Sequence, residues 1–394
     1  MGEPMRTTTR RALVPLVALA LLGAACTSDG DDSSGGDTSP DATDAPDETT
    51  APDETSAPDE TSAPDDTVEV VQGDESTLDA VIAAGSFKCG TRDDQPGFAT
   101  VDADGEHVGF DSDFCRVIAA AVLGDATAVE MVDLETADRF TALQSGEVDA
   151  LVRNTTWTAT RDGAEAATFL QPNYYDGQGM MVASDSGFAT LEDMTGELII
   201  CVARGTTTEG NAAADSARLG LDWEVRPFDD NTLIQEAFVA GQCDGWSADR
   251  SGLVGLQQSA YPDGPEVLTI LPGVFSKEPL GPVVNDGDTA WAQAVNWAVL
   301  ATIAAEELGI TSENVDTFAD TDDINIQRLL GLTVEGDAVL DPGLGLPTDF
   351  GYQVISQVGN YGEIFDRHLT PLGLDRGVNA QYYDGGLMYA PPYR

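Results

Sequence analysis

The chain has 394 residues, of which 69 are acidic and 18 are basic, for a formal net charge of −51. This excess of negative charge excludes electrostatic binding to a nucleic acid backbone. It does not exclude an acidic small ligand, because a single arginine can dominate the field inside a pocket. Beyond the first 75 residues about 320 remain, enough for two units with cores of their own.

The N-terminal segment has the pattern of a secretory signal. Three arginines within residues 6–11 precede a short apolar run at 13–22, and small residues follow it up to Cys26. The run is too short to span a membrane, which takes about 20 apolar residues. The small residues and Cys26 resemble a bacterial lipobox, whose cysteine is acylated, although Gly23 stands where leucine is usual. We expect residues 1–26 to be a lipoprotein signal peptide; a plain signal peptide with a chance cysteine is the alternative.

Residues 27–75 read as an acidic tether. A six-residue pattern of alanine, proline, acidic and hydroxyl residues recurs here, as in 51–56 and 57–62. Such a segment lacks the apolar residues that would offset its ordering entropy, and proline and like charges keep it extended. We expect a disordered spacer that holds a folded part away from a membrane. A tail without any role beyond solubility would have the same sequence properties.

From residue 76 on, hydrophobic patterns alternate between helix and strand. The segment 102–105 is interpreted as a hairpin turn rather than a calcium loop, because the later ligands of an EF-hand are missing. The β-α-β alternation around it implies a parallel sheet. The expected elements are a helix at 78–85, a strand at 87–91, a helix at 111–122, a strand at 128–132, a helix at 136–145 and a strand at 148–152.

A second stretch repeats this rhythm, which predicts two similar α/β lobes. The apolar segment 294–305 is too short for a membrane span and contains Asn296 and Thr302, so we expect a buried helix there. The expected elements of the second lobe are a strand at 198–202, a helix at 206–219, a strand at 223–227, a helix at 231–240 and a strand at 243–247.

At this point a family resemblance becomes visible. Seven short phrases, in the expected order over residues 78–394, resemble the amino-acid-binding proteins of ABC transporters. The sequence is most similar to the general L-amino-acid-binding group of solute-binding protein family 3. The matching phrases lie at 109–115, 139–146, 153–158, 173–179, 205–209, 276–282 and 386–392.

The resemblance implies an α/β fold of the periplasmic-binding-protein-like type II, with two lobes and a hinge of two crossover strands. It places residues 76–182 and 281–394 in lobe 1 and residues 183–280 in lobe 2. The lobes are expected to close by a hinge motion around a free L-amino acid, which an ABC transporter permease then receives. A monomer without cofactor or metal is implied, either lipid-anchored at the outer face of the bacterial cell membrane or periplasmic.

If Cys26 is acylated, four cysteines remain, and an even number in an exported domain favours disulfides. Their number alone allows three pairings. The topology of the family implies Cys89 with Cys115 and Cys201 with Cys243, one bridge in each lobe. Neither bridge would then cross the hinge.

In lobe 1 the resemblance assigns three ligand contacts. Arg161 stands at the position of the family's carboxylate-binding arginine, and a guanidinium suits a carboxylate because it offers two parallel donors. Thr156 is expected to add hydroxyl and backbone contacts, and Asn154 is a weaker candidate beside it. The structural alternative for Arg161 is a surface arginine at the start of a helix, where the helix dipole disfavours a cation.

In lobe 2 the resemblance assigns both ends of the ligand. Thr207, and next to it Thr206, follow Gly205 at a helix start, where free N–H groups bind anions. Asp249 matches the family's ammonium-binding aspartate. Helix capping is the structural alternative for each of these residues.

The side-chain pocket is less defined by the sequence. Many relatives stack an aromatic residue on the ligand, but Gln95 stands near that place here. Trp157 and Tyr174 are candidate substitutes, and core packing is the alternative for both. The departure from the usual aromatic residue fits a site with broad specificity for the ligand side chain.

Two other functions were weighed. An enzyme on the same fold, similar to a cyclohexadienyl dehydratase or a lytic transglycosylase, is disfavoured because no catalytic motif is present and the two histidines, His107 and His368, stand in a hairpin and a helix. An amino-acid sensor would need a membrane span and a signalling domain on the same chain.

Overall fold

The computed structural model describes residues 76–259, 264–334 and 339–394. The expected signal peptide at 1–26 with Cys26, and the expected tether at 27–75, lie outside the described residues. The described residues all fall in one unit of the chain by their contacts. Within it, two five-stranded sheets form the centres of two lobes.

The sheet of lobe 1 is mixed. Strand β1 pairs in parallel with β5 and β6, and β15 pairs antiparallel with β6 and β7. Helices α2 and α8 pack against each other beside it, and both are largely buried. In order across the sheet the strands are β5 (Val129–Asp133), β1 (Phe87–Thr91), β6 (Ala150–Leu151), β15 (Val283–Asn285) and β7 (Ala167–Phe169).

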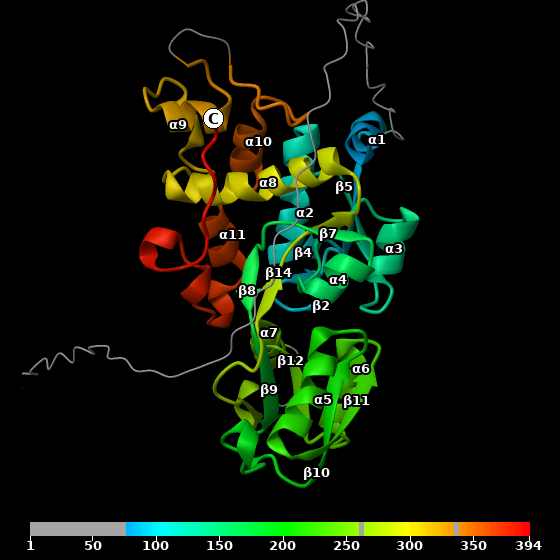
Figure 1. Cartoon of the computed structure of the whole chain (residues 1–394). Helices are drawn as coiled ribbons and strands as arrows, with labels where there is room; N and C mark the ends of the chain where they lie inside the picture. The colour runs from blue at the N-terminus through cyan, green and yellow to red at the C-terminus, as the bar shows by residue number, and fades with distance from the viewer. Residues whose placement is uncertain (1–75, 260–263, 335–338) are drawn as a thin grey trace, which may run out of the picture. The chain divides into compact units, whose positions relative to one another are not determined.

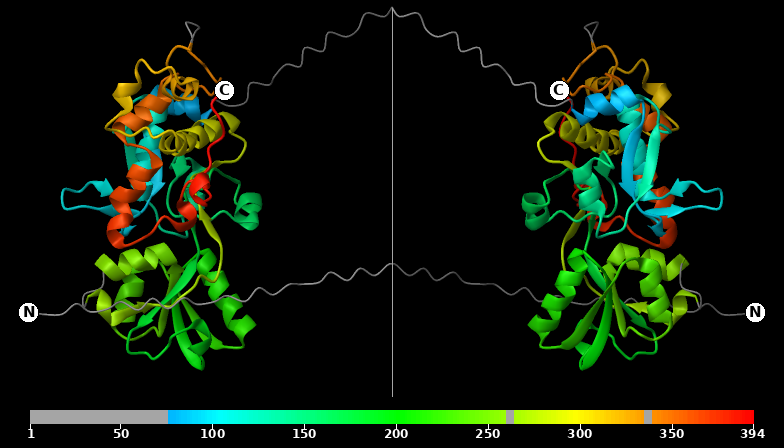
Figure 2. Two further views of the ribbon diagram at one scale, coloured as in Figure 1. Left: turned by 90° about the vertical axis from the view of Figure 1, so that its left-hand side faces the viewer. Right: turned by 90° about the vertical axis from the view of Figure 1, so that its right-hand side faces the viewer.

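Several helices from both ends of the chain cover this lobe. Figures 1 and 2 show α8 lying beside α2 and α10, and one hydrophobic core joins these helices. The apolar stretch at 294–305 is therefore a buried helix segment, as expected. No helix in the described ranges is long and apolar enough to cross a membrane. The helices are α1 (Thr77–Ala84), α2 (Phe110–Leu123), α3 (Arg139–Ser145), α4 (Ala159–Ala164), α8 (Thr289–Glu307), α9 (Ile324–Leu330), α10 (Phe350–Gln357) and α11 (Tyr361–His368).

The segment 102–105 is a hairpin turn between β3 and β4, as expected. The backbone N–H groups of Asp104 and Glu106 donate to Asp102 Oδ1, which explains why aspartate suits this turn. The described residues contain no cluster of side chains suited to a metal ion. The strands of this small sheet are β2 (Asp94–Gln95), β3 (Ala99–Val101) and β4 (His107–Val108).

The sheet of lobe 2 has helices on both faces, visible in the left view of Figure 2. Neighbouring residues of its strands point to opposite faces, so Met180 belongs to one hydrophobic core and Met181 to the other. In order across the sheet the strands are β11 (Asp222–Phe228), β10 (Glu197–Ala203), β12 (Gly245–Asp249), β9 (Gln178–Ala183) and β13 (Leu268–Ile270). The helices are α5 (Thr207–Leu219), α6 (Asn231–Val239) and α7 (Arg250–Ser259).

Two paired strands link the lobes. Strand β8 (Tyr174–Asp176) leads directly into β9, and β14 (Glu278–Leu280) returns the chain from lobe 2. They pair antiparallel with each other. The residues 178–182, which the sequence analysis placed in lobe 1, belong to the sheet of lobe 2, because β9 pairs with both β12 and β13. The strand crossing therefore lies a few residues earlier than expected.

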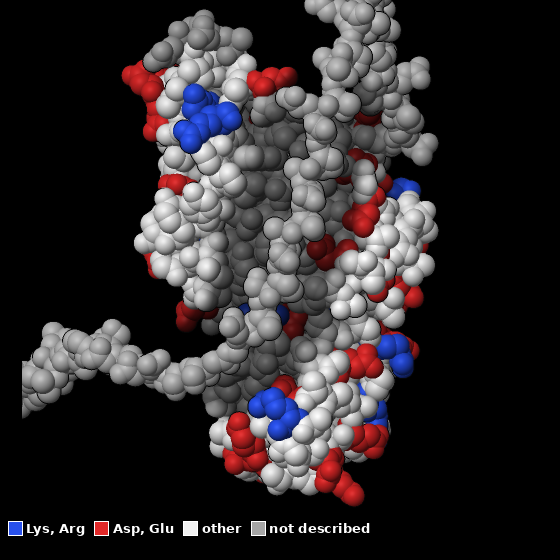
Figure 3. All heavy atoms as spheres, in the orientation of Figure 1, with Lys and Arg blue, Asp and Glu red and all other residues white. Residues whose placement is uncertain are grey.

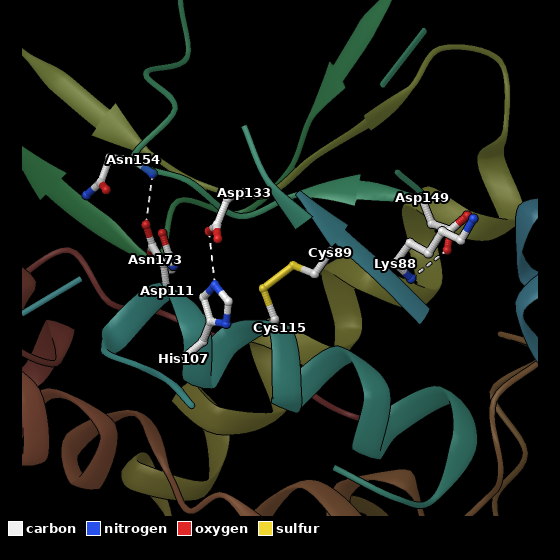
Figure 4. The surroundings of a disulfide bond; sticks show 9 residues. All are labelled: Lys88, Cys89, His107, Asp111, Cys115, Asp133, Asp149, Asn154 and Asn173. Atoms are coloured by element: carbon white, nitrogen blue, oxygen red, sulfur yellow. Dashed lines mark hydrogen bonds and ion pairs between the residues drawn. A yellow bond between two sulfur atoms is a disulfide. The ribbon is translucent and has the colours of Figure 1, made fainter. Parts of the chain in front are cut away.

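Both expected disulfides are present. Cys89 of β1 is bonded to Cys115 of α2, with 5.9 Å between their Cα atoms, and Figure 4 shows this bridge inside lobe 1. Cys201 of β10 is bonded to Cys243, which precedes β12, with a Cα separation of 5.8 Å. Each bridge ties one lobe together, and neither crosses the two linking strands.

The acidic composition appears on the surface. Figure 3 shows acidic side chains scattered over both lobes of the face it draws, with few basic ones between them.

Candidate functional site

Residues from both lobes line one small cavity. Most of them follow the carboxyl end of a strand, where the edges of parallel sheets commonly form binding sites. Lobe 1 contributes Arg92, Gln95, Thr136, Arg139, Asn154, Thr156 and Arg161. Lobe 2 contributes Ala203, Thr206, Thr207, Thr208, Asn231, Ala248 and Asp249.

Arg161 is held at this cavity from both lobes. Its side chain extends from α4, whose start is capped by Thr158. Nη1 donates to the Thr156 carbonyl at 2.9 Å, and Nη2 donates to the Gly205 carbonyl of lobe 2 at 3.2 Å. Arg161 is only 9% exposed, and this burial lowers its pKa against the opposing effects of Glu278 and Asp249. A fixed, poorly solvated guanidinium of this kind favours an anionic partner.

The threonines meet across the lobes. Thr156 Oγ1 of lobe 1 lies 3.4 Å from Thr207 Oγ1 of lobe 2. Thr206 caps helix α5, since its hydroxyl accepts from the Glu209 N–H at 3.1 Å. Gly205, at a φ of +72°, turns the chain from β10 into this helix. Thr207 and Thr208, the first two residues of α5, line the cavity, and N–H groups in a first helical turn have no partner within the helix.

Asp249 is the last residue of β12 and is half-buried at the cavity wall. Among the described residues none donates a hydrogen bond to its carboxylate. Burial, together with the nearby carboxylates of Asp176 and Glu278, raises its pKa well above the ordinary value of 3.8, although Arg92 and Arg161 act in the opposite direction. A cation placed beside Asp249 would relieve this unfavourable environment.

Two further arginines of the cavity were missed by the sequence analysis. Arg139 is 3% exposed, its Nη2 donates weakly to the Gly205 carbonyl at 3.4 Å, and its buried Nε has no partner. Burial and then the charge of Arg161 lower the pKa of Arg139 well below its ordinary range. Arg92 directly follows β1, and its Nε donates to Asp94 Oδ1 at 2.6 Å. Arg139 is the first residue of one of the family phrases, and this position could have indicated a role at the site. Nothing in the sequence, however, indicated that its side chain is buried.

Polar contacts beside the cavity join the lobes. The Asn231 N–H, at the start of α6, donates to Asp94 Oδ2 at 3.1 Å, and Asn231 Nδ2 donates to Gln95 Oε1 at 3.1 Å. Burial alone would raise the pKa of Asp94, but the Arg92 guanidinium and its hydrogen bond lower it to about 2. Gln95 therefore contacts the opposite lobe while it lines the cavity.

Asn154 also lines the cavity. Its backbone has a positive φ of 45°, its N–H donates to Asp111 Oδ2 at 2.8 Å, and its buried Oδ1 has no partner. A buried amide oxygen without a donor is costly, so a donor from a ligand would be favourable here.

The two aromatic candidates lie elsewhere. Trp157 is 42% exposed and stacks on Phe169, with ring centroids 6.2 Å apart, outside the set of cavity-lining residues. Thr156 pairs with Leu280 and faces the cavity, so the next residue of this extended segment points away. Tyr174 packs edge-on against Phe98 in the core of lobe 1. The expectation that Trp157 lines the ligand site is therefore not met by its position.

Comparisons with known proteins point to one family. Residues 87–314 match the family model of the bacterial extracellular solute-binding proteins, family 3. The chain is 46% identical to the glutamate/glutamine/aspartate/asparagine-binding protein BztA of Rhodobacter capsulatus, over 81% of this chain and 94% of that protein. It is 44% identical to the general L-amino acid-binding periplasmic protein AapJ of Rhizobium johnstonii, over 81% and 93% of the two chains.

A solved structure extends this similarity to the fold. An ABC transporter periplasmic binding protein from Brucella ovis, with glutathione bound, is 42% identical and has a TM-score of 0.77. The match covers 81% of this chain and 100% of that one. The fold is therefore shared with this periplasmic binding protein over its whole length.

Proposed function

Because the chain belongs to the bacterial extracellular solute-binding proteins of family 3, we propose that it captures an amino acid between its lobes and delivers it to an ABC transporter permease. The relatives are named as binding proteins rather than enzymes, and this chain is likewise a binding component. One observation carries the proposal for the site: Arg161 of lobe 1 and Asp249 of lobe 2 line the same cavity.

This pair suits the two charges that every free amino acid carries. Arg161 would bind the α-carboxylate through its guanidinium, aided by the first N–H groups of α5. Asp249 would bind the ammonium, which compensates the unfavourable burial of its carboxylate. Arg161 of lobe 1 already donates to the Gly205 carbonyl of lobe 2. A ligand carboxylate bound to both Arg161 and the start of α5 would therefore add a further link between the lobes.

The remaining cavity residues support a side chain that ends in oxygen acceptors. Arg139 has a buried Nε without a partner, and Arg92 and Thr136 stand beside it in the cavity wall. Donors of this kind fit the carboxylates of glutamate and aspartate, and also the amide oxygens of glutamine and asparagine. The relative from Rhodobacter capsulatus is named for these four amino acids. We therefore expect acidic and amide amino acids to be preferred within a broad range.

The proposal includes a membrane anchor. Cys26, acylated after cleavage of residues 1–26, would attach the protein to the outer face of the cell membrane, and residues 27–75 would serve as the tether. A single acyl chain gives only marginal membrane affinity, so stable attachment would need a second acyl chain or another membrane signal. A Cys26→Ser variant should appear in the medium or periplasm, whereas membrane attachment that survives the substitution would contradict this part.

The binding function is tested directly by calorimetry. Protein freed of co-purified ligand by unfolding and refolding should be titrated with a panel of L-amino acids, and native mass spectrometry of the protein as purified should reveal any retained ligand. Tight binding of at least one acidic or amide amino acid is expected. If no amino acid of the panel gave a heat of binding, the proposal would be refuted. Tight binding of apolar amino acids alone would refute the expected preference for acidic and amide side chains.

A further inference from the structure

Glu278 is a buried residue at the start of linking strand β14 and is only 1% exposed. Its Oε2 accepts a hydrogen bond from Thr207 Oγ1 at 2.8 Å. Its Oε1 accepts from Ser276 Oγ at 2.5 Å and from Asn211 Nδ2 at 3.1 Å. Glu278 is absent from the set of cavity-lining residues, yet it holds one member of that set, Thr207.

The contacts also join the linking strand to lobe 2. Thr207 and Asn211 are four residues apart on α5, so they lie on the same face of the helix. Both side chains donate to Glu278, which fastens the N-terminal end of α5 to β14. A purely structural role for Glu278 would end with this anchoring.

A count of protons indicates a second role. A threonine hydroxyl has one proton to donate and two lone pairs that accept. Thr207 donates its proton to Glu278, so the proton in its 3.4 Å contact with Thr156 Oγ1 comes from Thr156. The Thr207 hydroxyl can therefore only accept from the cavity side. An acceptor on the same cavity wall as Asp249 suits an ammonium group, whereas a ligand carboxylate would meet it lone pair to lone pair.

We propose that Glu278 is a positioning residue, which orients the Thr207 hydroxyl as an acceptor and thereby selects ligands that carry an ammonium group. This inference rests on the proposed function, that the cavity binds a free amino acid. It assigns the Thr207 hydroxyl to the ammonium end of the ligand, and it leaves the Thr207 backbone N–H for the carboxylate end. The family resemblance had led us to expect the whole residue at the carboxylate.

Glu278→Gln reverses the proton arrangement at Thr207. The oxygen position that accepts from both Ser276 and Asn211 fits the amide oxygen of glutamine, which puts the NH2 group next to Thr207. The Thr207 hydroxyl then accepts from this NH2 group and points its own proton into the cavity. A ligand ammonium is disfavoured there, and a carbonyl oxygen in its place is favoured.

The experiment compares L-glutamate with 2-oxoglutarate, which has a carbonyl where glutamate has its ammonium. Their Kd values are measured by calorimetry, with competition against glutamate for the weaker ligand. In Glu278→Gln we expect the Kd for glutamate to rise by about tenfold or more, while the Kd for 2-oxoglutarate stays constant or falls. Asn211→Ala, which loosens the same anchor without changing the proton of Thr207, should leave the ratio of the two Kd values within about twofold of the wild type.

Equal weakening of both ligands in Glu278→Gln, or the same change of the ratio in Asn211→Ala, would overturn the inference in favour of simple anchoring. If Glu278→Gln does not fold, Thr207→Val provides the test: glutamate should bind more weakly, 2-oxoglutarate should not, and Thr207→Ser should restore the preference. A uniform loss in Thr207→Val overturns the inference as well. Wild-type protein that binds neither glutamate nor any other amino acid refutes the proposed function itself, which is a separate outcome.

Discussion

Replacing Arg161 by alanine should weaken amino acid binding by about two orders of magnitude while the fold persists. Truncating one partner of a buried charge pair costs about 2–5 kcal/mol of binding free energy. Since each 1.4 kcal/mol is about a factor of ten, this corresponds to a rise in Kd of about 30-fold to several thousand-fold. Arg139 contacts the same Gly205 carbonyl and remains in the variant, so its charge retains part of the attraction. We therefore expect the lower part of this range, about 30- to 300-fold.

The stability of the ligand-free protein should change little. The variant loses two hydrogen bonds to carbonyl oxygens, those of Thr156 and Gly205. It also loses a guanidinium whose burial is unfavourable, as its lowered pKa indicates. These effects oppose each other, so we expect a net loss of about 1 kcal/mol, which lowers Tm by about 2–4 °C.

Calorimetry with L-glutamate and thermal unfolding of the ligand-free protein measure the two effects. Arg204→Ala is the matched control, because Arg204 lies on the surface of lobe 2 with a side chain that is 52% exposed and pairs with exposed Asp229. The control should bind like the wild type. A Kd for Arg161→Ala within threefold of the wild type would refute the carboxylate role. A fall in Tm well beyond 4 °C would instead identify Arg161 as a structural residue.

Two further predictions concern pH and the disulfides. Burial raises the folded-state pKa of Asp249, and raises those of Asp176 and Asp111 to about 6, above the ordinary 3.8. The folded, ligand-free protein thus holds protons that the unfolded chain releases, so Tm should fall as the pH rises from about 4 to about 7. Asp249→Asn should flatten this slope, and an unchanged slope would contradict the assignment. Opening the Cys89–Cys115 bridge, with a sequence separation of 26, should cost about 3.6 kcal/mol, and opening Cys201–Cys243, with a separation of 42, about 4.0 kcal/mol. Denaturant titration of variants in which both cysteines of one bridge are replaced by alanine measures these costs. The affinity for the ligand should persist at temperatures where the variants are folded, because neither bridge crosses the linking strands.

Much of the fold could be predicted from local patterns. The strand at 87–91 forms with the expected bounds, as a short and largely buried segment that follows a helix ending at Gly85. The helix expected at 136–145 begins only at Arg139, since Thr136 is used at the cavity and accepts a hydrogen bond from Arg153. The strand expected at 148–152 is reduced to Ala150–Leu151, where it pairs with β1. Pairing of this kind depends on residues far away in sequence, so local patterns could not set its length.

The candidate site, like the fold, could be predicted only in part. Arg161, Thr156, Thr207 and Asp249 were named from the family resemblance. The structure brings all four to one cavity, although more than ninety residues separate Thr156 from Asp249. Trp157 was misplaced because the direction of a side chain in an extended segment depends on the register against Leu280. A one-residue difference decides whether a side chain faces the cavity or the outer surface.

The arginines around the cavity show how binding and stability compete in this protein. The chain has only 18 basic residues, yet four arginines gather here: Arg92, Arg139, Arg153 and Arg161. Burial, and the charge of Arg92, lower the pKa of Arg153 to about 9, and burial and neighbouring guanidinium groups lower that of Arg139. Such a cluster is costly in the ligand-free state, and an anionic ligand would compensate it.

Arg139→Met tests this competition, because methionine replaces the buried stem of the side chain without its charge. The variant removes an Nε without a partner and a weak 3.4 Å hydrogen bond, so we expect the ligand-free protein to gain about 1–2 kcal/mol and its Tm to rise by about 2–8 °C. The same change should weaken the binding of glutamate by about tenfold more than the binding of glutamine, since only glutamate has a second carboxylate that loses its partner. Thermal unfolding and calorimetry on the same preparation measure both effects. A lower Tm together with equal losses for glutamate and glutamine would show that Arg139 supports the structure and does not read the ligand side chain.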